Sequence, residues 1–232
     1  MRADDLVLVQ GMEHTRLTLA RWNRTPVPVL LPWLRLSVGI AVGLLLAINC
    51  VARLAPPDPT RYAIAGYSSP AGAADYLGLV YRNSLVLALH ALACVAGFIA
   101  GSSLPLAASK RSGASRWVHE RAGPLAIAFV LCATAFSLCT QAYALGLGAG
   151  NIAGQLGVSP AKLLLALTPH ALPELTALFL PLAAWMIERR RGDWHELLAA
   201  TLVTVCVAVP VLLATAAVEL WFTPRILEAI SS

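Results

Sequence analysis

The chain has 232 residues, of which 58% are hydrophobic and 12% are charged, and its mean hydropathy is +0.72. Soluble domains carry about 25% charged residues, so this composition excludes a soluble globular protein and indicates an integral membrane protein. The formal net charge of +5 does not indicate a nucleic-acid partner, because the basic residues cluster in short connections between apolar runs, as membrane topology requires.

Residues 1–31 are polar to mixed, and we predict a cytoplasmic segment that lies along the lipid headgroups. Residues 12–22 have the pattern of a short amphipathic helix, and Trp22 and Trp33 are expected to act as interfacial anchors. Three prolines are expected to interrupt any helix in this region: Pro26, Pro28 and Pro32.

Five apolar runs are long enough to cross a membrane as helices. We predict one transmembrane domain over residues 32–225 and a short tail at 226–232. The predicted spans are residues 34–53, 83–108, 123–147, 169–187 and 197–222. The predicted fold class is therefore all-α: a polytopic bundle of about five transmembrane helices.

Small residues predict where these helices pack closely. Gly39 and Gly43 form a GxxxG pattern, which permits close approach of a second helix. In the second span, a histidine and three small residues fall on one helix face: His90, Cys94, Gly97 and Gly101. The five cysteines all lie in apolar runs and form no CxxC motif, so we interpret them as packing residues.

The connections predict the topology. Residues 54–81 read as a long loop in which 71–81 could form a short interfacial helix, whereas 109–122 and 188–196 read as basic loops. Twelve of the 17 basic residues fall on the side of the N-terminus. The positive-inside rule then places the N-terminus in the cytoplasm and the C-terminus on the opposite side of the membrane.

The fourth span carries two helix-start signals, Ser159-Pro160 and Thr168-Pro169. The nine residues between the two signals make a helix of about 14 Å, which is too short to cross a membrane. Residues 160–168 are therefore either a re-entrant half-helix or the first part of a proline-kinked span, and the sequence leaves both alternatives open.

Polar residues inside these apolar runs form the candidate site. His170 and Glu174 are four apart and share one helix face, and two prolines flank the histidine. Such groups are costly in lipid and usually face a protein interior or a wet cavity. The predicted topology brings further polar residues to the outer half of the membrane. The complete candidate polar cluster is Pro169, His170, Glu174, Glu219, Asn83 and His90.

Three roles are open for this cluster. Two histidines and two carboxylates could bind zinc, as in an intramembrane metalloprotease, but the chain has no HExxH motif. A proton or ion relay at a broken helix would suit a transporter. A structural cluster that locks the helices is the alternative we favour. With no phosphate loop and no nucleophile elbow, we predict a protein that is not an enzyme and that carries no metal or cofactor.

The stretch from Pro169 to Leu180 resembles the signature of the stage II sporulation protein M family. That signature has Pro-His-Gly, two apolar residues and then Glu-Leu-Pro-Ala-Ile. Five residues match it, while Ala171 replaces the glycine and Thr176 the proline. The matching residues are Pro169, His170, Glu174, Leu175 and Ala177.

Two further features resemble this family, and together the likeness covers about residues 80–225. Glu219, followed by Thr223-Pro224, is similar to the family's closing Ala-x-x-Glu and Thr-Pro. Asn83 resembles the asparagine that begins the family's second span.

The resemblance implies a polytopic α-helical membrane protein, and the sporulation member of the family is a scaffold that recruits peptidoglycan-degrading enzymes. Our first hypothesis is therefore a non-enzymatic membrane scaffold whose partners are the lipid bilayer and other membrane or cell-envelope proteins. The alternative is a permease subunit in which His170 and Glu174 line a path and an ATPase is the partner. Whether the chain forms a homo-oligomer stays open.

Overall fold

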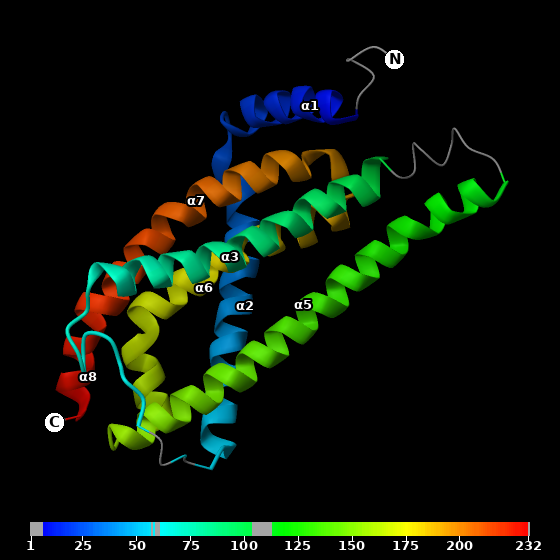
Figure 1. Cartoon of the computed structure of the whole chain (residues 1–232). Coiled ribbons are helices and arrows are strands. Elements are labelled where there is room, and N and C mark those ends of the chain that lie inside the picture. Colours follow the sequence, from blue (N-terminus) through cyan, green and yellow to red (C-terminus); the bar gives the residue numbers. More distant parts are fainter. Residues whose placement is uncertain (1–6, 57, 59–60, 104–112, 232) are drawn as a thin grey trace. The chain divides into compact units, whose positions relative to one another are not determined.

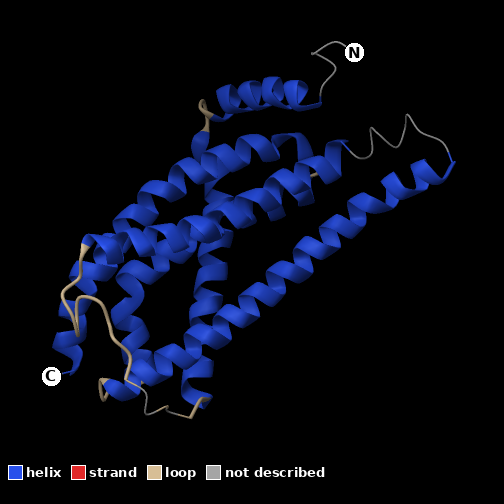
Figure 2. Cartoon of the chain, in the orientation of Figure 1, coloured by secondary structure: helices blue, strands red, loops and turns tan. Residues whose placement is uncertain are grey.

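The computed structural model describes residues 7–56, 58, 61–103 and 113–231. These residues form helices and connecting loops, with one isolated bridge between Ala65 and Ser69 and no β-strand (Figure 2). Five described segments are long and apolar enough to cross a membrane: Pro26–Leu54, Ala73–Gly101, Ile127–Gln155, Pro160–Arg191 and Trp194–Ser231. The predicted all-α class with five spans is therefore confirmed.

The helices are labelled in Figure 1, and three of the shorter elements are 3₁₀ or π turns. Their bounds are α1 Val7–Trp22, α2 Pro26–Leu54, α3 Ala73–Phe98, η2 Ile99–Ser103, α5 Gly113–Gln155, α6 Pro160–Arg191, η3 Trp194–Glu196, α7 Leu197–Ala217, η4 Val218–Phe222 and α8 Thr223–Ser231.

The chain divides into two compact units, and each of the five long helices contributes to both. Unit 1 comprises Met1–Ser37, Leu87–Thr134 and Phe179–Val207. Unit 2 comprises Val38–Val86, Ala135–Leu178 and Ala208–Ser232.

The N-terminal helices are longer than the sequence predicts. Helix α1 covers the predicted amphipathic stretch, and α2 begins at Pro26, where prolines were expected to interrupt a helix. The expectation is wrong because Pro26 and Pro28 lie in the first turn, where no intrahelical N–H donor is needed. Pro32 lies inside α2, and the helix continues through it.

Helix α3 begins at Ala73, so residues 71–81 are its first turns and not a separate interfacial helix. A side-chain cap explains this early start, because Asp75 Oδ2 accepts a hydrogen bond of 2.9 Å from the Gly72 N–H. The helix ends in the π turn η2. The last residues of the predicted second span, 104–108, lie outside the described residues.

Helix α5 begins at Gly113, so most of the predicted basic loop 109–122 is helical. That prediction relied on charge, and charged residues are good helix formers. Residues 109–112, with Lys110 and Arg111, lie outside the described residues. The glycines near the end of the predicted third span do not end the helix, which continues to Gln155.

Helix α6 settles the open question about residues 160–168. It runs unbroken from Pro160 to Arg191, so this stretch is the first part of the fourth span and not a separate re-entrant helix. Its C-terminus is fixed by a Schellman motif, in which Gly192 takes a φ of +82°. The N–H groups of Gly192 and Asp193 bond the carbonyls of Arg189 and Glu188 at 3.3 and 3.0 Å.

The helical structure does not end at residue 222, where the fifth predicted span ends. After α7, the π turn η4 leads directly into α8, which extends to Ser231 and includes most of the predicted tail 226–232. Pro224 occupies the first turn of α8, where a proline is tolerated. The π turn places Glu219 within the helical stretch and not beyond its end.

In unit 1, two tryptophans predicted as interfacial anchors are instead buried. Trp33 is fully buried and packs edge to face with Trp22 at a centroid distance of 5.2 Å. Its Nε1 donates a 2.9 Å hydrogen bond to Glu188 Oε1, and the Glu188 carboxyl group is only 1% exposed. A buried carboxylate therefore joins α2 to α6 within this unit.

The predicted packing face of α3 is confirmed in unit 1. His90, Cys94 and Gly97 are buried, and Gly97 lies directly against the Trp185 ring. Gly101 lies against the Trp194 ring in the same way. Cys94 also donates a hydrogen bond to the Pro181 carbonyl at 3.1 Å.

In unit 2, α5 and α2 approach closely through a GxxxG pair other than the predicted one. A Cβ atom on Gly146 would lie 2.5 Å from Val51 Cβ, and one on Gly150 would lie 3.0 Å from the Ala52 carbonyl oxygen. The predicted contact through Gly39 and Gly43 is wrong for the described residues, since a Cβ atom on either would meet nothing within 4 Å.

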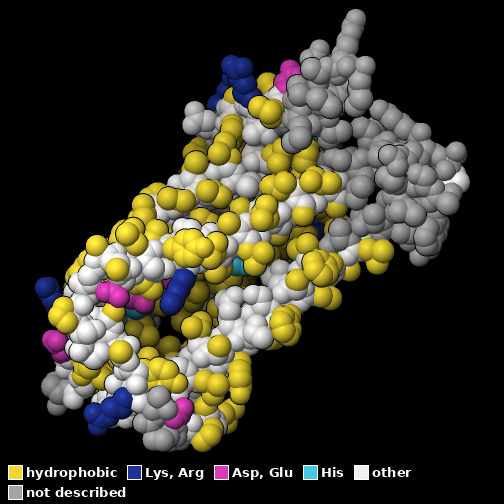
Figure 3. All heavy atoms as spheres, in the orientation of Figure 1, with side chains coloured by type: hydrophobic (Ala, Val, Ile, Leu, Met, Phe, Trp, Pro, Cys, Tyr) yellow, Lys and Arg dark blue, Asp and Glu magenta, His cyan; other side chains and the backbone are white. Residues whose placement is uncertain are grey.

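Large hydrophobic side chains are exposed along the helices, as Figure 3 shows for one face of the molecule. Phe129, Phe136 and Leu165 are among the most exposed. Contiguous apolar surface of this kind is unusual on a soluble monomer and suits contact with lipid.

Substitution of Gly146 by alanine should lower the free energy of unfolding by about 1–3 kcal/mol, because the added methyl group overpacks the contact with Val51. Chemical unfolding in detergent micelles measures this change. The matched control is Gly148→Ala on the same helix, where a Cβ atom meets nothing within 4 Å. A control variant that loses as much stability as Gly146→Ala would contradict the assigned packing.

Candidate functional site

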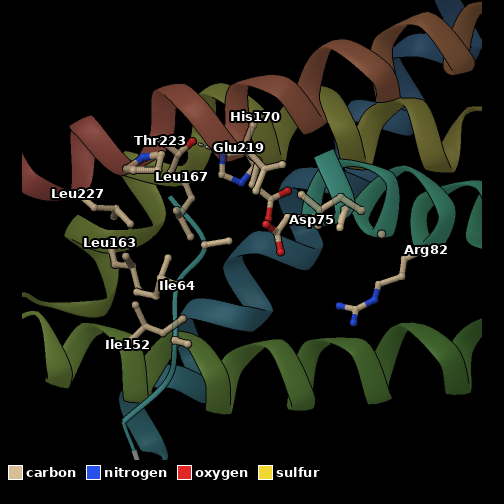
Figure 4. Close-up of a pocket in the computed structure, with 17 residues that line it drawn as sticks. Ile64, Asp75, Arg82, Ile152, Leu163, Leu167, His170, Glu219, Thr223 and Leu227 are labelled. Atoms are coloured by element: carbon tan, nitrogen blue, oxygen red, sulfur yellow. Dashed lines mark hydrogen bonds between the residues drawn. The ribbon is translucent and has the colours of Figure 1, made fainter. Parts of the chain in front are cut away.

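A cavity of about 510 Å³ lies within unit 2 (Figure 4). The segments that enclose it are the loop 63–65, the first turns of α3, the end of α5, the first turns of α6, and η4 with α8. Its polar side chains are Asp75, Arg82, His170, Glu219 and Thr223, and its larger apolar ones include Ile64, Ile152, Leu163, Leu167 and Leu227.

The loop wall of the cavity is fixed by hydrogen bonds to the end of α5. The Tyr62 N–H donates to Gln155 Oε1 at 2.9 Å, and Gln155 Nε2 donates to the Tyr62 carbonyl at 3.1 Å. Asn151 Nδ2 donates to the Tyr62 hydroxyl at 3.2 Å. Farther along the loop, Gly66 has a φ of +81° and a Cβ atom there would lie 2.7 Å from Pro224 Cγ, so the loop packs tightly on α8.

His170 is held by a residue far away in the sequence. Its Nδ1 lies 2.8 Å from Thr223 Oγ1, and both residues are buried. Thr223 Oγ1 in turn donates to the Val218 carbonyl at 3.2 Å, across the π turn. Because the Thr223 hydroxyl has one proton and directs it to Val218, we assign His170 Nδ1–H as the donor to Thr223. In the neutral imidazole, Nε2 is then left as an acceptor.

Glu219 lines the cavity, whereas Glu174 lies one turn beyond His170 on α6 and outside the lining. Glu174 has Glu219 and Asn83 as its polar neighbours. Two buried atoms in this group, Glu174 Oε2 and Asn83 Nδ2, have no hydrogen-bond partner among the described residues. An unsatisfied buried polar atom costs about 1–3 kcal/mol, and Glu188 Oε2 and Trp185 Nε1 in unit 1 are two further such atoms.

The charged groups of the cavity are not paired with one another. Neither described salt bridge includes Asp75, Glu219 or Arg82. Figure 4 shows the Arg82 guanidinium apart from the carboxyl groups of Asp75 and Glu219. The lining therefore carries two acidic groups and one basic group, and none of the three takes part in a described salt bridge.

The structure brings together most of the predicted polar cluster. Asn83, His170, Glu174 and Glu219 all belong to unit 2, with Pro169 beside His170 on the exposed side of α6. His90 does not join them in the structure, because it belongs to unit 1, where its ring contacts Phe179 at a centroid distance of 5.4 Å.

Three cavity residues were missed as site residues: Asp75, Arg82 and Thr223. Asp75 and Arg82 fall in or beside the stretch predicted as a loop, so their place on α3 was not expected. Thr223 was considered only as part of the closing Thr-Pro of the family resemblance. The Thr-Pro pair gave no sign of its contact with His170, which is 53 residues away in the sequence.

One group of described acidic side chains, in unit 1, is close enough to hold a metal ion. Ligand atoms of Glu188, Asp193 and Glu196 lie within 4.8 Å of one another. Two arginines already pair with this group, Arg191 with Glu188 at 3.2 Å and Arg21 with Glu196. The zinc set considered from the sequence forms no such group among the described residues.

Comparison with protein-family models, curated proteins and solved structures found no match to this chain. The resemblance to the stage II sporulation protein M family therefore stays a prediction. Residues that carry the resemblance nevertheless meet in the structure, since His170 bonds Thr223 and Glu174 neighbours Glu219 and Asn83.

Substitution of Thr223 by valine keeps the shape of the side chain and removes the acceptor of the buried His170 N–H. We expect the free energy of unfolding to fall by about 1–2 kcal/mol, the range for a lost hydrogen bond inside a helical membrane protein. Thermal unfolding in detergent measures the loss. Thr140→Val is the control, because the exposed Thr140 hydroxyl bonds only carbonyls of its own helix. Equal stability of the two variants would rule out a structural role for the bond.

Proposed function

We propose that this protein is a multi-pass protein of the bacterial plasma membrane that binds a small polar solute in the cavity of unit 2, as the membrane subunit of a permease. The observation that carries the proposal is the cavity itself. Binding sites are concave and mostly apolar with a few convergent polar groups, and this cavity has that composition. Ionisable residues inside membrane-spanning helices are costly and usually mark substrate or ion pathways.

The proposed orientation has the N-terminus in the cytoplasm and the C-terminus outside. Twelve of the 17 basic residues support it, because they fall in the N-terminal segment and the two connections on the same side. The remaining five include Arg82, Lys162 and Arg225, which lie near the cavity ends of their helices. In this orientation the cavity opens away from the cytoplasm.

The proposal includes no chemical conversion of the solute, so we propose that the chain is not itself an enzyme. A permease subunit of this kind works with an ATPase on the cytoplasmic side. The exposed apolar surfaces of the helices contact the lipid bilayer. The polar groups of the cavity would recognise the solute and replace part of its hydration shell.

The second candidate is a membrane scaffold for cell-envelope proteins, similar to the sporulation member of the resembling family. The contact between His170 and Thr223 favours it, because this bond ties α6 to α8 and joins two separate parts of the family resemblance. In this case the polar cluster holds the helices in register for a docking surface, and the cavity has no solute.

Water must reach the cavity if the first candidate is correct. A cysteine at Leu167, which lines the cavity, should react with a membrane-impermeant thiol reagent in a variant that lacks the five native cysteines. The matched control is Leu165→Cys, two residues earlier on the same helix, whose side chain is 74% exposed on the outer surface. We expect slower labelling at that position because lipid covers it. A cysteine at Leu167 that stays unlabelled from both sides of the membrane would contradict solute access.

The partner distinguishes the two candidates. Crosslinking and purification from native membranes should capture an ATPase if the protein is a permease subunit. Capture of a cell-wall enzyme, and its loss in the His170→Ala/Glu174→Ala double variant, would instead support the scaffold and overturn the permease assignment. Quantitative mass spectrometry of both preparations, at equal amounts of the chain, measures the outcome.

A further inference from the structure

The side chains that line the cavity accept more hydrogen bonds than they donate. Glu219 supplies two carboxylate oxygens, and Asp75 supplies a carboxylate whose Oδ2 already accepts the Gly72 N–H. We assign His170 Nε2 as an acceptor because Nδ1–H is assigned to the bond with Thr223. The Thr223 hydroxyl proton is used by the Val218 carbonyl. Arg82 is the one cationic side chain of the lining. A ligand that complements these groups must therefore bring N–H donors of its own.

The charge of the lining also favours a ligand that carries hydrogen-bond donors and no negative charge. No described ion pair neutralises Asp75 or Glu219, and Figure 4 shows the Arg82 guanidinium apart from both carboxyl groups. Glu174 adds a third acidic side chain next to Glu219, behind the cavity wall. An anion in this cavity would meet two carboxylates, the exposed Asp75 and the partly buried Glu219, and like charges repel.

The apolar part of the lining indicates that the ligand also has a hydrocarbon part. Leu163, Leu167 and Leu227 form it together with Ile64 and Ile152, so the part of the cavity away from the carboxylates is apolar. A volume of about 510 Å³ accommodates an organic molecule and is far larger than an inorganic cation needs.

We infer that the cavity binds an organic ammonium ion, with its N–H donors directed to Asp75 and Glu219 and its hydrocarbon part against the leucines and isoleucines. This inference rests on the proposed function, because it names the class of solute that the permease subunit would recognise. An ammonium group has three donors, which matches the excess of acceptors in the lining. Hydrogen bonds to charged acceptors are also stronger than neutral ones.

The test uses three probes of nearly equal shape and different charge: benzylammonium, benzyl alcohol and benzoate. Isothermal titration calorimetry with the full chain in lipid nanodiscs separates saturable binding at one site per chain from partition into lipid, which does not saturate. We expect benzylammonium to bind at least tenfold more tightly than benzyl alcohol, and benzoate to show no saturable binding.

Two isosteric variants identify the site. Glu219→Gln and Asp75→Asn should each weaken benzylammonium binding about tenfold or more, because each removes one charged acceptor. The control is Glu228→Gln, an exposed acidic residue of α8 that does not line the cavity, and it should bind like the wild type. Thermal unfolding of each variant shows whether it is folded, and Asp75→Asn provides the test if Glu219→Gln is not.

The outcomes separate this inference from the proposed function. If benzyl alcohol or benzoate binds as tightly as benzylammonium at the same site, the ammonium assignment is wrong while the solute-binding cavity stands. If benzylammonium binds Glu219→Gln and Asp75→Asn as tightly as it binds the control Glu228→Gln and the wild type, the ammonium does not contact these carboxylates and the inference fails. Absence of saturable binding by all three probes also overturns it, and labelling of the cysteine at Leu167 then decides the proposed function independently.

Discussion

The hydrogen bond between His170 and Thr223 is the contact on which the candidate site depends. It connects the first half of α6 to α8, and through Thr223 it extends to the Val218 carbonyl on the other side of the π turn. A π turn holds an additional residue, so it changes the direction of the side chains that follow it in the helix. The bond therefore fixes three things together: the orientation of the imidazole, the path of the last span and the position of Glu219.

Two carboxylates inside the helical units, the buried Glu188 and the partly buried Glu174, each have acidic neighbours but differ in their basic partners, and this difference supports a functional role for Glu174 near the cavity. In unit 1, Glu188 accepts hydrogen bonds from Trp33 and Arg191, so its charge is compensated within the protein. In unit 2, Glu174 has another carboxylate, Glu219, as its neighbour and takes part in neither described salt bridge. Each of the two carboxylates leaves one oxygen without a described hydrogen-bond partner. Proteins retain such unfavourable polar groups mainly where they serve function, because a hydrophobic replacement would be more stable.

The amino-acid sequence was sufficient for the coarse architecture, and its errors share one physical cause. The number of spans follows from the length of apolar runs, which the bilayer imposes locally on each segment. The helix ends were misplaced because charge and proline were taken to end helices. A helix continues through charged residues, as α5 does from Gly113, and it tolerates proline in its first turn, as at Pro26 and Pro224.

The sequence by itself determined that His170 and Glu174 share a helix face, because the period of a helix is fixed by local geometry. Only the tertiary structure decided which distant residues they meet: Thr223, Glu219 and Asn83 join them in unit 2, whereas His90 belongs to unit 1. The rotation and order of packed helices depend on contacts summed over whole interfaces. The sequence of one segment specifies only its own side of each interface. For the same reason a cavity lined by five separate segments could not be predicted from any of them.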